Sequence, residues 1–182
     1  GQAKLLHDRA RVTGVDLEGT YTLKDPDTDE ETTHQYDYES LGAGIFVVCP
    51  GPNGKIYGGT AMPLRLFKYD PDTGDSVDLG NPTLTDGEIY SMTIRDGKLW
   101  VCAYGGAYLS VYDPSQPWAF GTEPGDNPRG YGYVGDGHLR PRAMLVGPEN
   151  LIYIGSHPPY GQLGGAMAVF DPEKWEVLEN YR

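Results

Sequence analysis

Two short stretches near the end of the chain concentrate residues that bind anions or transfer protons. They are "GHLRPR", residues 137–142, and "SHPPYG", residues 156–161. The full chain of 182 residues has only four histidines and fourteen lysines and arginines. An arginine holds a carboxylate through two parallel hydrogen bonds, and histidine and tyrosine serve as general bases and acids. The candidate catalytic residues are therefore His138, Arg140, His157 and Tyr160.

One chemistry that fits these residue types is β-elimination from a uronate sugar. That reaction needs a cation that neutralises the carboxylate and so acidifies the proton on C5. It also needs a base with a pKa near neutrality and an acid for the leaving oxygen. In this interpretation Arg140 holds the carboxylate, His157 or Tyr160 removes the proton, and His138 assists. Arg142 would contribute to substrate binding.

Two other interpretations of the same residues stay open. His138 and His157, with Glu88 or Asp136, could bind a divalent metal ion, although their spacing is not diagnostic. Apart from that metal ion, no cofactor is expected. The second interpretation is structural, with arginines paired to the abundant carboxylates and His157 hydrogen-bonded at the end of a strand. The structural interpretation is favoured for Arg142.

An internal repeat predicts the elements that must position these residues. Four segments end in Asp-Pro, and their aspartates are 45, 43 and 58 residues apart. Three of the segments carry a second anchor, which reads "GKIYGGT", "GKLWVCAY" and "NLIYIGSH". A period of about 40 to 50 residues with four short strands is typical of a β-propeller blade. The four aspartates are Asp25, Asp70, Asp113 and Asp171.

The strands can be placed within four modules, residues 1–43, 44–82, 83–137 and 138–182. The high counts of 26 glycines and 15 prolines agree with many short strands joined by turns. The sequence therefore predicts an all-β fold, a β-propeller with about four blades in this chain. Strands are expected at 10–16, 19–25 and 30–40, with a short inner strand at 3–7; at 44–49, 55–60, 65–70 and 76–81; at 89–95, 98–104 and 108–113; and at 142–147, 151–157, 166–171 and 175–181.

The repeat resembles bacterial propellers whose blades read G-x-[IV]-[YW]-x-G, followed by a strand that ends Y-D-P-x-T-G. That resemblance covers most of the chain and implies a seven-bladed ring. The chain would then be part of a longer polypeptide, which is the favoured alternative, or another chain or segment would complete the ring. The remaining alternative is a ring that four blades close alone. The candidate residues resemble, in type and location, the sites of propeller polysaccharide lyases. The resemblance specifies the fold better than the function, because propellers support many activities.

The predicted topology brings the candidate residues to one face. Strands A to D run from the inner to the outer edge of a blade, so the B–C and D–A loops share a face. The longest connections are the stretch 114–140, interpreted as a D–A loop, and the B–C loop 158–166. A hairpin turn at 148–150 would place residues 141 and 157 opposite one another. On the adjacent rim of the third module, the same logic predicts three further substrate-binding residues, Glu88, Tyr90 and Tyr104.

Composition limits the ligands and the compartment. A formal net charge of −12 argues against nucleic acid, whose protein partners usually carry a basic stripe. No apolar run approaches the roughly 18 residues of a membrane span. Cys49 and Cys102 lie in apolar strands and are expected to be free, buried thiols, with a disulfide between them as the alternative that stays open. The "DPDT" repeats echo part of a calcium loop, but their recurrence in every module favours a turn.

The sequence thus predicts a secreted, carbohydrate-binding repeat protein that acts on an anionic saccharide by lyase chemistry. Its expected location is extracellular or periplasmic, without nucleic-acid or membrane partners. One alternative is a non-catalytic propeller module of a bacterial sensor or surface protein that binds a ligand or another protein. Another alternative is a metal-dependent propeller hydrolase or lactonase.

Overall fold

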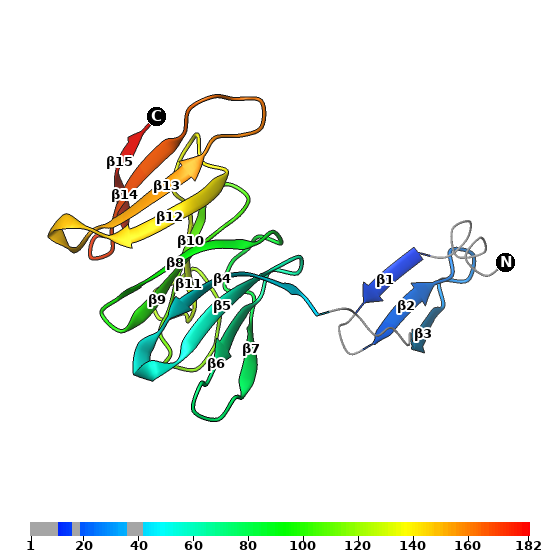
Figure 1. Cartoon of the computed structure of the whole chain (residues 1–182). Coiled ribbons are helices and arrows are strands. Elements are labelled where there is room, and N and C mark those ends of the chain that lie inside the picture. Colours follow the sequence, from blue (N-terminus) through cyan, green and yellow to red (C-terminus); the bar gives the residue numbers. More distant parts are fainter. Residues whose placement is uncertain (1–10, 16–18, 36–41) are drawn as a thin grey trace. The chain divides into compact units, whose positions relative to one another are not determined.

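The computed structural model describes residues 11–15, 19–35 and 42–182. It forms two compact units, Gly1–Gly42 and Ala43–Arg182. The described residues form antiparallel sheets joined by turns, with two single 3-10 turns at Pro52–Gly54 and Pro148–Asn150 (Figure 1). The all-β prediction is therefore confirmed. No helix among these residues is long and apolar enough to cross a bilayer.

The first unit contains one three-stranded antiparallel sheet. Its strands are β1 (Arg11–Val15), β2 (Thr20–Lys24) and β3 (Glu31–Gln35), in that order across the sheet. The turn after β2 is held by Asp25, whose Oδ1 accepts hydrogen bonds from the backbone N–H groups of Asp27 and Thr28. The inner strand predicted at residues 3–7 lies outside the described residues.

The second unit contains three four-stranded blades. In each blade the strands are neighbours in sequence order, and the inner strands of successive blades contact one another. In Figure 1, β8 lies between β4 and β12. This is the arrangement of consecutive propeller blades, as predicted. The strands are β4 (Gly44–Pro50), β5 (Ile56–Ala61), β6 (Leu66–Tyr69) and β7 (Ser76–Gly80); β8 (Ile89–Arg95), β9 (Lys98–Ala103), β10 (Tyr108–Tyr112) and β11 (Arg129–Tyr133); and β12 (Arg140–Val146), β13 (Ile152–His157), β14 (Ala166–Asp171) and β15 (Glu176–Tyr181).

Two hydrophobic cores lie between the blades rather than within them. The first joins blade β4–β7 to blade β8–β11 and includes Tyr57, Leu66 and Leu99. The second joins blade β8–β11 to blade β12–β15 and includes Trp100 and Phe170. Leu99 and Trp100 are neighbours on β9 and point to opposite faces, because side chains alternate along a strand. One blade thus contributes to both cores.

The repeated aspartate begins the connection between the last two strands of each described sheet, and its side chain accepts hydrogen bonds from the backbone that follows. Oδ1 of Asp70 accepts from the backbone of Asp72 at 3.0 Å, and Oδ1 of Asp171 accepts from Glu173 at 2.9 Å. A hydrogen bond from the Lys55 ammonium lowers the pKa of Asp70, and the backbone donors act in the same direction. The turn interpretation of the "DPDT" repeats is therefore confirmed.

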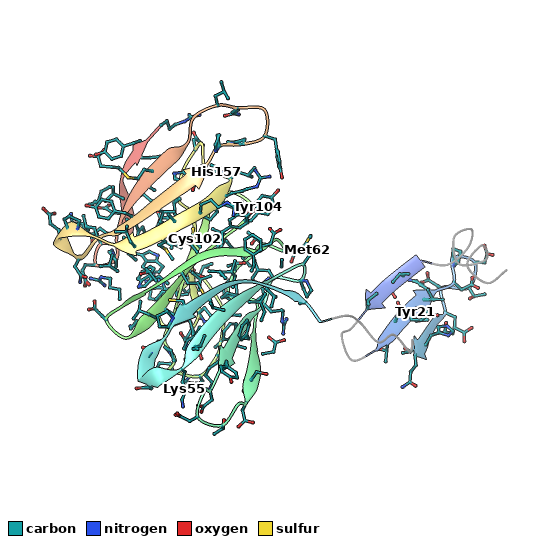
Figure 2. The ribbon with its side chains drawn as sticks, in the orientation of Figure 1. Tyr21, Lys55, Met62, Cys102, Tyr104 and His157 are labelled. Carbon is teal, nitrogen blue, oxygen red and sulfur yellow. The ribbon has the colours of Figure 1, made fainter. Side chains whose placement is uncertain are left out.

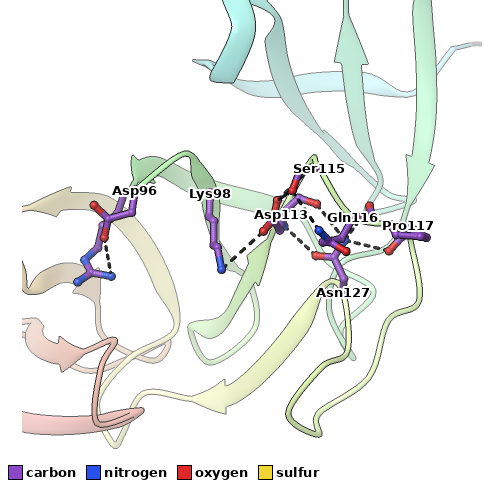
Figure 3. Close-up of polar contacts among 8 residues, drawn as sticks. Asp96, Lys98, Asp113, Ser115, Gln116, Pro117 and Asn127 are labelled. Carbon is purple, nitrogen blue, oxygen red and sulfur yellow. Dashed lines mark hydrogen bonds and ion pairs between the residues drawn. The ribbon is translucent and has the colours of Figure 1, made fainter.

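The third blade corrects one prediction. Residues 129–133 form the outer strand β11, which pairs with β10, so the long insertion 114–128 joins β10 to β11. It is a C–D connection and lies on the face of the aspartate turns, not on the face of the B–C loops. Asn127 anchors it: Oδ1 accepts from the Asp113 N–H, and Nδ2 donates to the carbonyls of Asp113, Gln116 and Pro117 (Figure 3).

Both cysteines are free thiols, as predicted. Cys102 is buried in the second core, and this burial raises the pKa of its thiol. Cys49 is only partly buried, which differs from the prediction, because it lies on β4 at the edge of the first core. Burial raises the pKa of Cys49 too, so neither thiol is activated toward chemistry at neutral pH.

Candidate functional site

Arginine and aromatic side chains alternate along one rim of the second unit. The guanidinium carbon of Arg140 lies 4.1 Å from the ring centroid of Tyr160 and 5.9 Å from that of Tyr104. The guanidinium carbon of Arg142 lies 4.8 Å from the Tyr90 ring. Ring contacts at 6.0 Å and 4.7 Å connect Tyr90 to Tyr104 and to Phe46. We call this set the rim array: Phe46, Tyr90, Tyr104, Arg140, Arg142 and Tyr160.

The blade architecture assembles the rim array from three successive inner strands. Phe46 lies on β4, Tyr90 on β8, and Arg142 on β12. Tyr104 follows β9, and its backbone N–H donates to the Glu88 carbonyl at 2.9 Å. In Figure 2, Tyr104 and His157 lie toward one side of the second unit, away from Lys55. The array therefore lies where the B–C loops begin, at the rim that the sequence predicted.

The register of the last hairpin matches the predicted placement closely. Arg140 pairs with His157 across β12 and β13, where residue 141 was expected opposite residue 157. The one-residue difference arises at a bulge between Arg140 and Ala143. The bulge contains Pro141, which has no N–H to donate to the ladder. Arg140 and His157 therefore leave the sheet at the same end of the blade.

Neither arginine of the rim array has an acidic partner. Among the residues that the structure describes, Arg140 and Arg142 form no salt bridge, whereas Arg65 and Arg95 pair with Asp78 and Glu173. This differs from the structural interpretation, in which carboxylates neutralise both guanidiniums. Two cations without a salt bridge in the described structure stand out in a chain with a net charge of −12.

His138 lies apart from the rim array. Its side chain is 5% exposed, and both ring nitrogens are hydrogen-bonded. Nε2 donates to Oδ1 of Asn180 at 3.0 Å, because a carbonyl oxygen can only accept. Nδ1 of the neutral ring then accepts from the Ser156 hydroxyl at 2.6 Å. Neither nitrogen is left to take a substrate proton, so the assisting role predicted for His138 has no support in this geometry.

The protonation of His138 is expected to make stability depend on pH. Burial lowers its pKa below the ordinary value of 6.5. The unfolded chain therefore binds a proton at this histidine more readily than the folded chain does. The contribution of the neutral, buried His138 to stability is thus present above pH 6.5 and is lost as the pH falls below that value. Urea unfolding measured at pH 7.5 and at pH 5.0 should show that the free energy of unfolding falls between these two pH values. The fall should be smaller in His138→Gln than in the wild type. His157→Gln, on an exposed histidine, should keep the wild-type decrease; an equal decrease in all three proteins would contradict the prediction.

His157 and Tyr160 are exposed and free to meet a ligand. The His157 imidazole has no hydrogen-bond partner among the described residues. It borders a shallow hollow of about 510 Å³ on the outward face of the last blade, together with Arg142, Met167 and Tyr181. Tyr160 is 72% exposed, and its ring is covered on one side by Arg140.

Glu88 takes part in the site through its backbone. Its carbonyl accepts from Tyr104, and it forms an isolated bridge with Ala61. In the described part of the chain, no three histidine, cysteine, aspartate or glutamate side chains gather in a way that could hold a metal ion. Phe46 was not predicted, because its apolar run "IFVVC" is typical of any buried strand.

Comparison with known proteins supports the fold and leaves the activity open. No protein-family profile and no curated protein matches the sequence. Hydrazine synthase of Kuenenia stuttgartiensis aligns over 89% of this chain and 42% of that chain, with a TM-score of 0.57 and 15% identity. A protein from Lactobacillus plantarum aligns over 89% and 49%, with a TM-score of 0.50 and 14% identity. The chain thus spans less than half the length of either protein, and the likeness extends to the fold alone.

Proposed function

We propose that the rim array binds an anionic saccharide of the uronate type. The observation that carries this proposal is the pair Arg140 and Arg142, each lying over a tyrosine ring and without a carboxylate partner in the described structure. An unpaired guanidinium offers a planar fork of donors that matches a sugar carboxylate. Because stacking fixes the plane of each guanidinium, less side-chain entropy is lost when the ligand binds.

The aromatic members suit the rest of such a ligand. Sugar rings have apolar C–H faces, which pack on aromatic surfaces, and tyrosine keeps a hydroxyl for hydrogen bonding. Phe46, Tyr90 and Tyr104 form a continuous run of ring contacts across two blades, so they could follow several residues of a polymer. We further propose that more blades, from another chain or segment, complete the ring around this rim. Such polymers are met outside the cytoplasm, which fits an extracellular or periplasmic location.

Calorimetric titration with oligogalacturonate tests the proposal. We expect saturable binding that weakens as salt is added, because the recognition is partly ionic. The methyl ester of the same oligosaccharide keeps the sugar face and loses the charge, so it should bind at least about 10-fold more weakly. Equal affinity for the acid and the ester, or no binding of the acid, would overturn the proposal.

A second candidate function is β-elimination on the bound uronate. It is favoured by the position of Arg140, which lies over the Tyr160 ring and pairs in register with His157. Arg140 would neutralise the carboxylate, and the imidazole or the phenolate would remove the C5 proton. The electrons of that C–H bond form the C4–C5 double bond as the C4–O bond breaks, and the leaving glycosidic oxygen takes a proton from the other of these two side chains or from water. New ultraviolet absorbance from the unsaturated product supports this reaction, whereas binding without it supports a non-catalytic module.

A further inference from the structure

We propose a second ligand site, for a small carboxylate, in a pocket on the opposite face of the molecule. The pocket has a volume of about 450 Å³ and lies between the blades β8–β11 and β12–β15, at the end of the aspartate turns. That volume is within the range of small-molecule sites. Its principal lining residues are Trp100, Val111 and Arg129 from one blade and Pro172, Glu173 and Trp175 from the next. We call it the turn-side pocket.

Strand register places the two chief donors on one wall. Val111 pairs with Trp100 across β10 and β9, and with Arg129 across β10 and β11. Residues paired in this way point to the same face of a sheet, so Trp100 and Arg129 flank Val111. The guanidinium carbon of Arg129 lies 3.9 Å from the centroid of Trp175, whose ring is 5.9 Å from that of Trp100. The facing blade thus holds Arg129 in place by stacking.

Two donors on this wall have no acceptor. Nε1–H of Trp100 and Nε–H of Arg129 are buried and find no hydrogen-bond partner in the described structure. The Trp100 side chain is only 3% exposed. A buried donor without an acceptor is costly, and folded proteins leave few of them. Both atoms are donors, so the missing partner is an acceptor.

The lining carries four carboxylates and three cations, and the ion pairs among them leave Arg129 as the cation that an anionic ligand would meet. Arg95 pairs with Asp96 at 3.0 Å and with Glu173 at 2.8 Å. Lys98 lies 3.6 Å from Asp113, which also accepts from Ser115 (Figure 3). The Asp126 carboxylate, another lining group, accepts from the Glu123 N–H. Among the described residues, Arg129 is the lining cation without a salt bridge.

A carboxylate satisfies both requirements at once. The two carboxylate oxygens can accept from the parallel Nε–H and Nη–H donors of Arg129. One of these oxygens can also accept from the indole N–H of Trp100. Val111, Pro172 and the tryptophan rings leave apolar surface for the body of the ligand. The structure therefore assigns to this pocket a carboxylate attached to a small apolar or aromatic group.

Proton–nitrogen correlation spectra of the wild-type chain, titrated with benzoate, test this site directly. We expect the Trp100 indole and Arg129 Nε–H signals to shift together, with a Kd on the order of 1 mM. Benzamide, which has the same shape and no charge, should bind at least about 10-fold more weakly. If benzoate shifts neither signal, the pocket holds only water and the proposal is wrong; equal binding of benzamide also overturns it.

Variants of Arg129 and of Lys174 distinguish binding at this site from a general effect of surface charge on benzoate binding. Arg129→Gln should weaken benzoate binding by at least about 10-fold, and Arg129→Lys should be intermediate, because lysine keeps the charge and loses the fork. Lys174→Gln, on an exposed lysine of the neighbouring turn, should bind benzoate as the wild type does. An unchanged affinity in Arg129→Gln contradicts the proposal. Because the readout is specific to Trp100 and Arg129, the result is independent of the rim array.

Discussion

Replacing both arginines of the rim array by glutamine is expected to lower the affinity for oligogalacturonate by about 100-fold or more. Each charged hydrogen-bonding group contributes about 1.5 to 3 kcal/mol, and no described carboxylate competes for Arg140 or Arg142. The single variants should each lose about 10-fold. Calorimetry on the four proteins measures these values and their additivity, and non-additive losses would indicate that both guanidiniums hold one carboxylate.

Stability should barely change in the double variant. Neither guanidinium forms a salt bridge in the described structure, Arg142 is exposed and Arg140 is half-buried. Surface substitutions of this kind usually alter unfolding free energies by less than about 0.5 kcal/mol, and the half-buried Arg140 should add little to that. Arg65→Gln is the matched control, because it also removes one arginine, but its partner Asp78 lies on the outer strand β7. It should bind the saccharide with wild-type affinity. Wild-type affinity in the double variant would show that the rim array is not the saccharide site.

The fold was largely predictable because the repeat shows where each strand lies and which of its residues face the neighbouring blade. Leu99 and Ile152 take corresponding places in the anchor motifs, and each is fully buried against the preceding blade. The aspartate that follows each third strand is equally local, since its turn hydrogen bonds span two or three residues. Patterns that depend only on near neighbours in sequence are those a sequence can reveal.

The position of the insertion 114–128 was predicted wrongly, because it depends on contacts between residues distant in sequence. The segment "RGYGY" of β11 alternates glycine with tyrosine, and it lies within the stretch 114–140, which the sequence alone predicts as a D–A loop. Its strand state depends on pairing with β10 and on Asn127, which holds the insertion against Asp113 from 14 residues away. Glycine-rich composition favours loops locally, but tertiary pairing overrides this preference.

The candidate site divides in the same way. The opposition of Arg140 and His157 followed from hairpin geometry and was predicted to within one residue. The burial of His138 was not predicted, because its hydrogen-bond partners Ser156 and Asn180 lie 18 and 42 residues further along the chain. Nor could the sequence show that the rim arginines lack carboxylate partners, because that depends on side-chain placement across three blades.

Tyr57→Ala is expected to destabilise the second unit by about 3 to 5 kcal/mol, whereas Tyr153→Ala should cost less than about 1 kcal/mol. The two tyrosines occupy corresponding strand positions, and each ring lies against the glycine of its own turn, Gly51 or Gly147. The local surroundings are therefore matched. They differ in their packing beyond that turn: Tyr57 is 2% exposed in the core between blades, whereas Tyr153 is half-buried on the outward face of the last blade and belongs to neither core.

Chemical denaturation of the two variants therefore measures the contact between blades. Removing a ring from a packed core leaves a cavity, whereas removing one from an open face mainly changes hydration. A large loss in Tyr153→Ala would contradict the prediction and show that the outward face is covered in solution. If that loss grew with protein concentration, the cover would be a second copy of the chain, because stability depends on concentration only when molecules associate.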